Sequence, residues 1–201
     1  MDVGVFVNCP FDARYAKKFR SIVFTTVYCG FDPRCALEVA DGGQNRLEKI
    51  LQIIEECPYA IHDISRVQLS AERLPRFNMP FELGLFLGAK AFGNKGHRNK
   101  KCLVLDSIPY RYQKFLSDIS GQDIAAHNEN FREVITQVRN WLAQFKADLL
   151  PGEQPITKDF ERFAREFPDI CRRAGITSKR VIFNDFVNIV ESWIARRAVV
   201  I

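Results

Sequence analysis

Short apolar runs alternate with amphipathic segments along most of the chain, and this alternation limits the folds that it can adopt. Apolar residues, many of them β-branched or aromatic, form the runs expected to be strands, at residues 3–7, 31–39, 59–64 and 102–105. Apolar residues at helical spacing mark the segments expected to be helices, at residues 13–28, 45–57, 78–92 and 131–149. Strands that alternate with helices through short loops are typical of a parallel sheet with helices on both faces. The sequence therefore predicts an α/β fold.

The C-terminal part of the chain carries helical patterns with no strand between them. Helices are expected at residues 160–171 and 186–197, after a Pro-containing linker at residues 151–155. We therefore expect an α/β domain over residues 1–150. A C-terminal helical extension over residues 151–201 is expected to pack back on that domain or on a partner.

The composition is that of a globular protein, with 47% hydrophobic and 26% charged residues. The net charge of +5 fits a phosphate-bearing ligand but is too small to indicate nucleic-acid binding. The six cysteines have no C-x-x-C spacing, which predicts reduced thiols and a cytoplasmic protein. No apolar run approaches the roughly 20 residues of a membrane span, so no membrane association is expected.

Several common catalytic motifs are absent. The first strand is not followed by G-x-G-x-x-G, and there is neither a P-loop nor a G-x-S-x-G elbow. The first absence argues against a standard dinucleotide dehydrogenase, and the second excludes a P-loop NTPase. His62 and Asp63 are neighbours on a strand and point to opposite faces, so they cannot bind one metal together. Asp123 and His127 are four residues apart and would supply only two ligands, so no metal site is expected.

Polar residues cluster where the expected strands end, which is where open α/β sheets bind ligands. Asn8 ends the first strand, Arg34 lies in the second, and Asp63 and Ser65 end the third. Each of these residues also has a structural interpretation. Asn8 and Asp63 are residue types that commonly hold turns through their own side chains, and Arg34 could be a surface arginine.

Glu82 is a charged residue in an otherwise apolar helix start. Its neighbours Phe81 and Leu83 are apolar, as is most of the helix. If Met79 is the N-cap, Glu82 occupies the third helical position, where glutamate commonly caps a helix. The alternative is a semi-buried carboxylate at the strand ends. Burying a carboxylate costs folding free energy. A glutamate in that position therefore indicates a functional role.

Three segments together resemble the superfamily of nucleoside 2-deoxyribosyltransferases and TIR-like proteins. They are Asn8-Cys9-Pro10-Phe11-Asp12, His62-Asp63-Ile64-Ser65 and Asn78-Met79-Pro80-Phe81-Glu82-Leu83-Gly84. In that superfamily a first strand runs into a Pro-Phe loop, an Asp ends the third strand, and the Glu of a Glu-x-Gly segment is catalytic. Phe77-Asn78-Met79-Pro80 replaces the Asp-x-Gly-Thr segment of the transferases. The chain therefore looks like a divergent TIR-like branch, of the sort found in bacterial anti-phage defence.

The resemblance covers about residues 1–125 and implies a flavodoxin-like sheet and an enzyme that cleaves or transfers at an N-glycosidic bond. The implied substrate is NAD or a related nucleotide, with no cofactor and with Glu82 as the catalytic carboxylate. Asn8 and Asp63 would hold ribose hydroxyls, and Phe11 or Phe77 would stack on a base. The residues expected to bind substrate are Asn8, Pro10, Phe11, Arg34, Asp63, Ser65, Phe77 and Asn78.

Two other functions fit the same sequence. One is a nucleotide sensor in which Glu82 binds ribose without turnover. The other is a self-associating module, a homo-oligomer whose contact is the loop at residues 40–45.

Overall fold

The computed structural model describes residues 3–38, 41–67 and 76–198. The strands are β1 (Gly4–Asn8), β2 (Asp32–Arg34), β3 (Tyr59–Asp63), β4 (Lys101–Asp106) and β5 (Ile124–Ala126). The α-helices are α1 (Ala16–Tyr28), α2 (Arg46–Glu56), α3 (Asn78–Phe92), α4 (Phe131–Leu142), α5 (Glu153–Arg173) and α6 (Phe183–Ala198).

All strand pairs in the five-stranded sheet are parallel, and the strand order is β2-β1-β3-β4-β5. This is the flavodoxin-like order, in which the strand order reverses beside β1. The predicted α/β, flavodoxin-like fold class is therefore confirmed.

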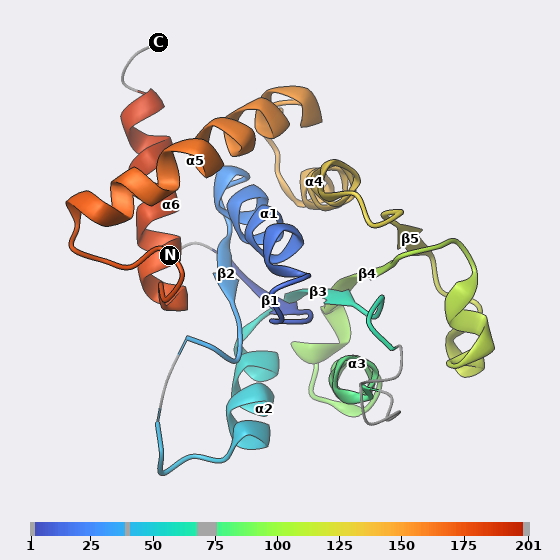
Figure 1. Ribbon diagram of the computed structural model, residues 1–201. Helices are drawn as coiled ribbons and strands as arrows, with labels where there is room; N and C mark the ends of the chain where they lie inside the picture. The colour runs from blue at the N-terminus through green and yellow to red at the C-terminus, as the bar shows by residue number, and fades with distance from the viewer. Residues whose placement is uncertain (1–2, 39–40, 68–75, 199–201) are drawn as a thin grey trace.

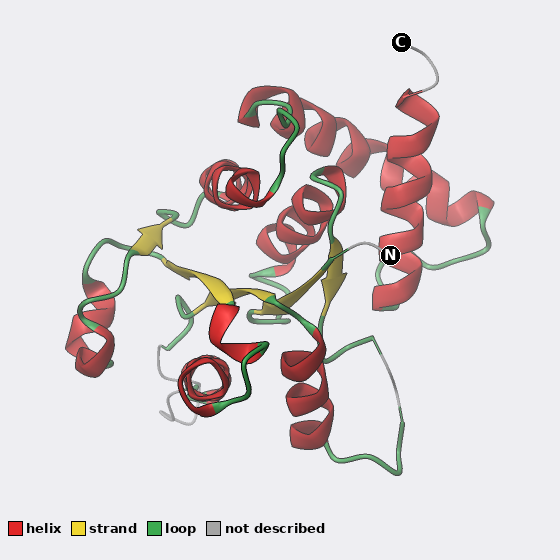
Figure 2. Cartoon of the chain, turned by 180° about the vertical axis from the view of Figure 1, so that it is seen from behind, coloured by secondary structure: helices red, strands yellow, loops and turns green. Residues whose placement is uncertain are grey.

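Helices cover both faces of the sheet (Figures 1 and 2). Val5 and Val7 of β1 point into a core shared with α1, α4, α5 and α6. Phe6, between them, points to the opposite face and packs with residues of α2 and α3. The alternation of side chains along a strand thus assigns each strand residue to one helix layer.

The two C-terminal helices share a core with α1. The ring of Phe24 in α1 lies 5.4 Å from Phe160 and 5.3 Å from Phe163 of α5, and 5.8 Å from Trp193 of α6. The division of the chain at residue 150 stays a prediction, but α5 and α6 cover the outer surface of α1.

One expected strand end was wrong, and one strand was not expected. The second strand ends at Arg34 rather than continuing to residue 39, because Glu38 folds back in a turn and binds Arg34. Strand β5 was missed because it is only three residues long and lies in a polar stretch. Its pairing with β4, rather than a hydrophobic pattern of its own, makes it a strand.

Four helix boundaries differ from the expectation by three residues or more. Helix α1 begins at Ala16 instead of residue 13. Helix α4 ends at Leu142 instead of residue 149, and Lys146 beyond it donates to the carbonyl of Gly30 at 2.8 Å. Helix α5 begins at Glu153, inside the expected linker. Pro155 is tolerated there because the first-turn N–H groups have no intrahelical partner. Helix α6 begins at Phe183, three residues before the predicted start at Phe186.

Lys100 belongs to a stretch rich in basic residues, 95–101, but it is buried. Its ammonium group donates to the backbone carbonyls of Ile54 and Cys57, the latter at 2.6 Å. These carbonyls lie at the C-terminal end of α2, where a cation satisfies acceptors that the helix leaves free. Lys100 therefore joins α2 to the beginning of β4.

Candidate functional site

A cavity of about 570 Å³ lies at the carboxyl end of β1, beside the first turns of α2 and α3. Six residues predicted from the sequence line it together: Asn8, Pro10, Phe11, Phe77, Asn78 and Glu82. Five lining residues were not predicted: Cys9, Asp12, Arg46, Arg76 and Met79. Larger cavities of about 630 and 780 Å³ lie near β4 and α4, but neither is lined by a glutamate.

Glu82 supplies a buried carboxylate to this cavity. The residue is only 5% exposed, and its side chain forms no hydrogen bond with any described residue. Among the described residues, Arg46 forms an ion pair with it, with Nη2 4.0 Å from Glu82 Oε1. Burial raises the pKa of Glu82 from its ordinary 4.5 to about 7, and the charge of Arg46 opposes part of that rise. A carboxyl with such a pKa exchanges its proton near neutral pH.

Capping does not explain this placement of Glu82. The N-cap of α3 is Phe77, without a side-chain cap, and Asn78 is already the first helical residue. Met79 is the second helical residue and not the N-cap. Glu82 is thus one turn inside the helix, beyond the third position from which a glutamate caps.

Asn8 lines the cavity with an amide that is fixed from two sides. Its Nδ2 lies 3.0 Å from the carbonyl oxygen of Met79 and 2.9 Å from His62 Nδ1. Asn8 is 2% exposed and His62 is fully buried. These contacts join the end of β1 to β3 and to the first turn of α3.

Arginines surround the mouth of the cavity. Arg46 is the first residue of α2, placed there by Asn45, whose side chain accepts from the backbone N–H of Glu48. Arg76 Nη1 lies 3.2 Å from Asp12 Oδ2, and Arg66 Nη2 lies 3.5 Å from the same oxygen. The position of Arg46 could have been predicted from the sequence, because a residue directly after the N-cap of α2 lies at the carboxyl edge of the sheet.

Two aromatic residues give the cavity an apolar surface. The side chain of Phe77 is 65% exposed, just before α3. Phe11 lies after β1 and packs edge-on against Phe19 at 5.2 Å between ring centroids. Exposed aromatic rings of this kind can stack on a planar base.

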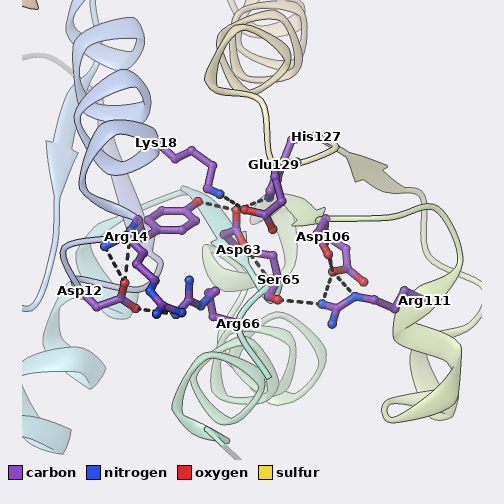
Figure 3. A network of polar contacts seen from close by, with 12 residues as sticks. Asp12, Arg14, Lys18, Asp63, Ser65, Arg66, Asp106, Arg111, His127 and Glu129 are labelled. Atoms are coloured by element: carbon purple, nitrogen blue, oxygen red, sulfur yellow. Dashed lines mark hydrogen bonds and ion pairs between the residues drawn. The ribbon is translucent and has the colours of Figure 1, made fainter. Parts of the chain in front are cut away.

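Asp63 does not line the cavity, because it faces the other side of the sheet (Figure 3). Asn8 pairs in register with His62, so Asp63, one residue further, points to the opposite face. There its Oδ2 accepts from the hydroxyl of Tyr15 and lies 3.1 Å from His127 Nε2, off line for a linear hydrogen bond. Burial opposes ionisation of Asp63, but His127, Ser65 and Tyr15 outweigh it and hold its pKa below the ordinary value.

Ser65 also lies outside the cavity, in the polar network of Figure 3. Its backbone N–H donates to Asp63 Oδ1 at 2.8 Å, and its carbonyl accepts from Arg111. Arg111 is held by an ion pair with Asp106 at the end of β4. This network joins the carboxyl ends of β3 and β4.

Arg34 lies apart from the other predicted residues. It forms ion pairs with Glu38 at 2.6 Å and Glu56 at 3.1 Å. It lines a different cavity, between β2 and α6. The interpretation of Arg34 as a structural arginine therefore fits its contacts.

Asp123 and His127 lie at opposite ends of β5 and not on a helix. His127 instead accepts from the backbone N–H of Glu129 through Nδ1 at 3.1 Å. Within the part of the chain that the structure describes, no group of three or more His, Cys, Asp or Glu residues could hold a metal ion. Each of the six cysteines is a free thiol.

Comparisons with protein-family models, curated proteins and solved structures find no match to this chain. No helix in the described ranges is both long and apolar enough to cross a bilayer. What the cavity does must therefore follow from its own geometry and chemistry.

Proposed function

We propose that the protein cleaves or transfers at the N-glycosidic bond of a nucleotide, with Glu82 as the catalytic carboxylate. The observation that carries the proposal is a 5% exposed glutamate with no described hydrogen-bond partner, facing a cavity with arginines at its mouth. The likeness of the motifs around Asn8 and Glu82 to the TIR-like and deoxyribosyltransferase superfamily supports the same chemistry. NAD is the proposed substrate, and no cofactor is required.

The proposed reaction uses the negative charge of Glu82. When the bond from the anomeric carbon to nicotinamide breaks, its electron pair moves to the pyridinium nitrogen and neutral nicotinamide leaves. The ribose carbon becomes oxocarbenium-like and positive, which a carboxylate on that face stabilises. Water then adds to the carbon and releases a proton, giving ADP-ribose; a transferase would use another nucleophile instead.

The other cavity residues are proposed to position the nucleotide. Phe77 would stack on a base, and Phe11, Pro10 and Asn78 would bound the pocket. Arg46 and Arg76 offer guanidinium groups that pair well with phosphate oxygens. Asp63, Ser65 and Arg34 lie outside this cavity and are left out of the proposed binding set.

A nucleotide sensor without turnover is the second candidate. A pKa of about 7 keeps part of the Glu82 population protonated at neutral pH. In that form Glu82 can donate to and accept from ribose hydroxyls without stabilising a cation. The superfamily likeness further favours a cytoplasmic homo-oligomer with a role in anti-phage defence. The loop at residues 40–45, proposed as its contact, lies partly outside the described residues.

Release of nicotinamide from NAD tests the proposal. Glu82→Gln keeps the shape of the side chain but removes its charge, so we expect at least a ~100-fold loss of rate. Glu48→Gln is the matched control, because Glu48 is exposed on α2 and lies outside the cavity. Equal rates for Glu82→Gln and wild type would eliminate the catalytic role. Tight nucleotide binding with no nicotinamide release by wild type would favour the sensor.

A further inference from the structure

The amide of Asn8 has two possible orientations, and its neighbours select one of them. The atom that faces the carbonyl oxygen of Met79 at 3.0 Å must be Nδ2, because an amide oxygen there would oppose another oxygen. The other hydrogen on Nδ2 then points to His62 Nδ1, 2.9 Å away. Both donor hydrogens of Asn8 are therefore used inside the protein.

This arrangement also selects the tautomer of His62. Nδ1 must accept the hydrogen bond from Asn8, so the ring proton resides on Nε2, a buried atom with no hydrogen-bond partner among the described residues. His62 is fully buried between Phe6 and Phe86, with ring centroids 5.7 and 5.3 Å away. Burial lowers the pKa of His62 to about 3, so the ring stays neutral at physiological pH and Nδ1 stays an acceptor.

One polar atom of the Asn8 amide remains. Oδ1 has no hydrogen-bond partner among the described residues, and Asn8 lines the cavity that contains Glu82. We propose that His62 is a positioning residue that fixes Asn8 so that its carbonyl oxygen, an acceptor only, is offered to the ligand. The ligand group bound there is then a hydrogen-bond donor, a sugar hydroxyl or an N–H.

The same geometry excludes an anionic group at this point of the cavity. A phosphate or carboxylate oxygen would meet the oxygen of Asn8 without a hydrogen between them, and Glu82 adds a further negative charge. The phosphates of a nucleotide must therefore lie towards the arginines, and its sugar towards Asn8. This inference rests on the proposed function only in taking this cavity as the nucleotide-binding site. It requires that the nucleotide binds there, and not that its bond is cleaved.

The tautomer can be observed directly in the wild-type protein. Nitrogen-15 NMR of the histidine rings should show His62 with unprotonated Nδ1 and protonated Nε2, with no titration between about pH 5 and pH 8. A proton on Nδ1, or titration in that range, would overturn the inference. This measurement needs neither a ligand nor a variant.

A pair of His62 variants tests the consequence for binding. His62→Asn can place an amide oxygen near the position of Nδ1 and keep the acceptor, whereas His62→Leu removes it and frees the Asn8 amide to turn. The probes are ADP-ribose, which carries hydroxyl donors and has no nicotinamide to release, and inorganic pyrophosphate, which carries the anion alone. Binding of each is measured by calorimetry, with thermal melting as a check on folding.

We expect His62→Leu to weaken ADP-ribose binding about 10-fold, the effect of one lost hydrogen bond. His62→Asn should bind it nearly as wild type does, and pyrophosphate affinity should not change in either variant. Equal loss for both probes, unchanged ADP-ribose affinity in His62→Leu, or no ADP-ribose binding by wild type would overturn the inference. If His62→Leu does not fold, the NMR measurement still decides. Absence of nicotinamide release from NAD would count against the proposed reaction alone.

Discussion

The buried carboxylate of Glu82 destabilises the folded protein when it is ionised. Its pKa is raised from 4.5 to about 7 by burial, so the folded state binds its proton more tightly than the unfolded state does. The stability linked to this proton is present below about pH 4.5 and is lost as the pH rises through about 7. The linked free energy is on the order of 3 kcal/mol.

Glu82→Gln should therefore stabilise the protein at high pH. We expect a higher free energy of unfolding than wild type at about pH 8 and little difference at about pH 4. Urea titrations of both proteins at each pH measure this. His62, whose pKa is lowered by burial, destabilises the fold as the pH falls from 6.5 towards 3 in both proteins, so it cancels in the comparison. A uniform effect at both pH values would contradict the buried-carboxylate assignment.

The charge of Arg46 lowers the pKa of Glu82, so replacing Arg46 should shift the pH dependence of any NAD cleavage. The carboxylate is the active form, so the rate should rise with pH and level off above about 7. In Arg46→Gln the favourable charge is lost, and the midpoint of that rise should move to higher pH. Arg98→Gln, an exposed position outside this cavity, should leave the midpoint unchanged.

Glu82 and Asn8, both singled out from the sequence, line the same cavity, whereas Asp63 lies on the other side of the sheet. Glu82 was visible because a charge in an apolar helix start is unusual, and Asn8 because it ends an apolar strand. The side of the sheet on which Asp63 lies depends on register with β1, in which Asn8 pairs with His62. Register is set by tertiary pairing, which no local pattern records.

At the scale of elements, the buried ammonium of Lys100 should contribute more to the free energy of unfolding than an exposed lysine of the same basic segment does. Lys100→Met removes the donor to the carbonyls of Ile54 and Cys57, which remain at the end of α2. We expect a loss of about 1–3 kcal/mol in the free energy of unfolding, measured with urea. Lys101→Met, at the exposed neighbouring residue, should change it by less than about 0.5 kcal/mol. Similar losses for both variants would show that the hydrogen bonds of Lys100 are unimportant.

Periodicity predicts β1, β3, β4, α2 and α3 to within a residue or two of their observed bounds. The two shortest strands depend on contacts that periodicity does not record. Strand β5 needs β4 as a partner, and β2 is short because Glu38 turns back onto Arg34. The hydrophobic pattern of a single segment does not predict such contacts.

At the scale of the whole molecule, the core that joins α1 to α5 and α6 should make the chain unfold as one unit. Phe163 is 1% exposed, and its ring contacts those of Phe24, Phe186 and Trp193. Phe163→Ala should cost about 3–5 kcal/mol. Circular dichroism and tryptophan fluorescence should report one coincident transition in wild type and variant. Separate transitions, with the sheet surviving, would show that the C-terminal helices are an independent unit.

The covering of α1 by the last helices also bears on how the chain folds during synthesis. Phe24 leaves the ribosome early, whereas the rings of Phe160, Phe163 and Trp193 that cover it are made long afterwards. At about 5–20 residues per second the 135 residues between Phe24 and Phe160 take roughly 7–27 s to synthesise. During that interval a nascent sheet would carry an uncovered aromatic surface, the kind of surface to which chaperones bind. Slow translation of the C-terminal segment should therefore lower the yield of native protein.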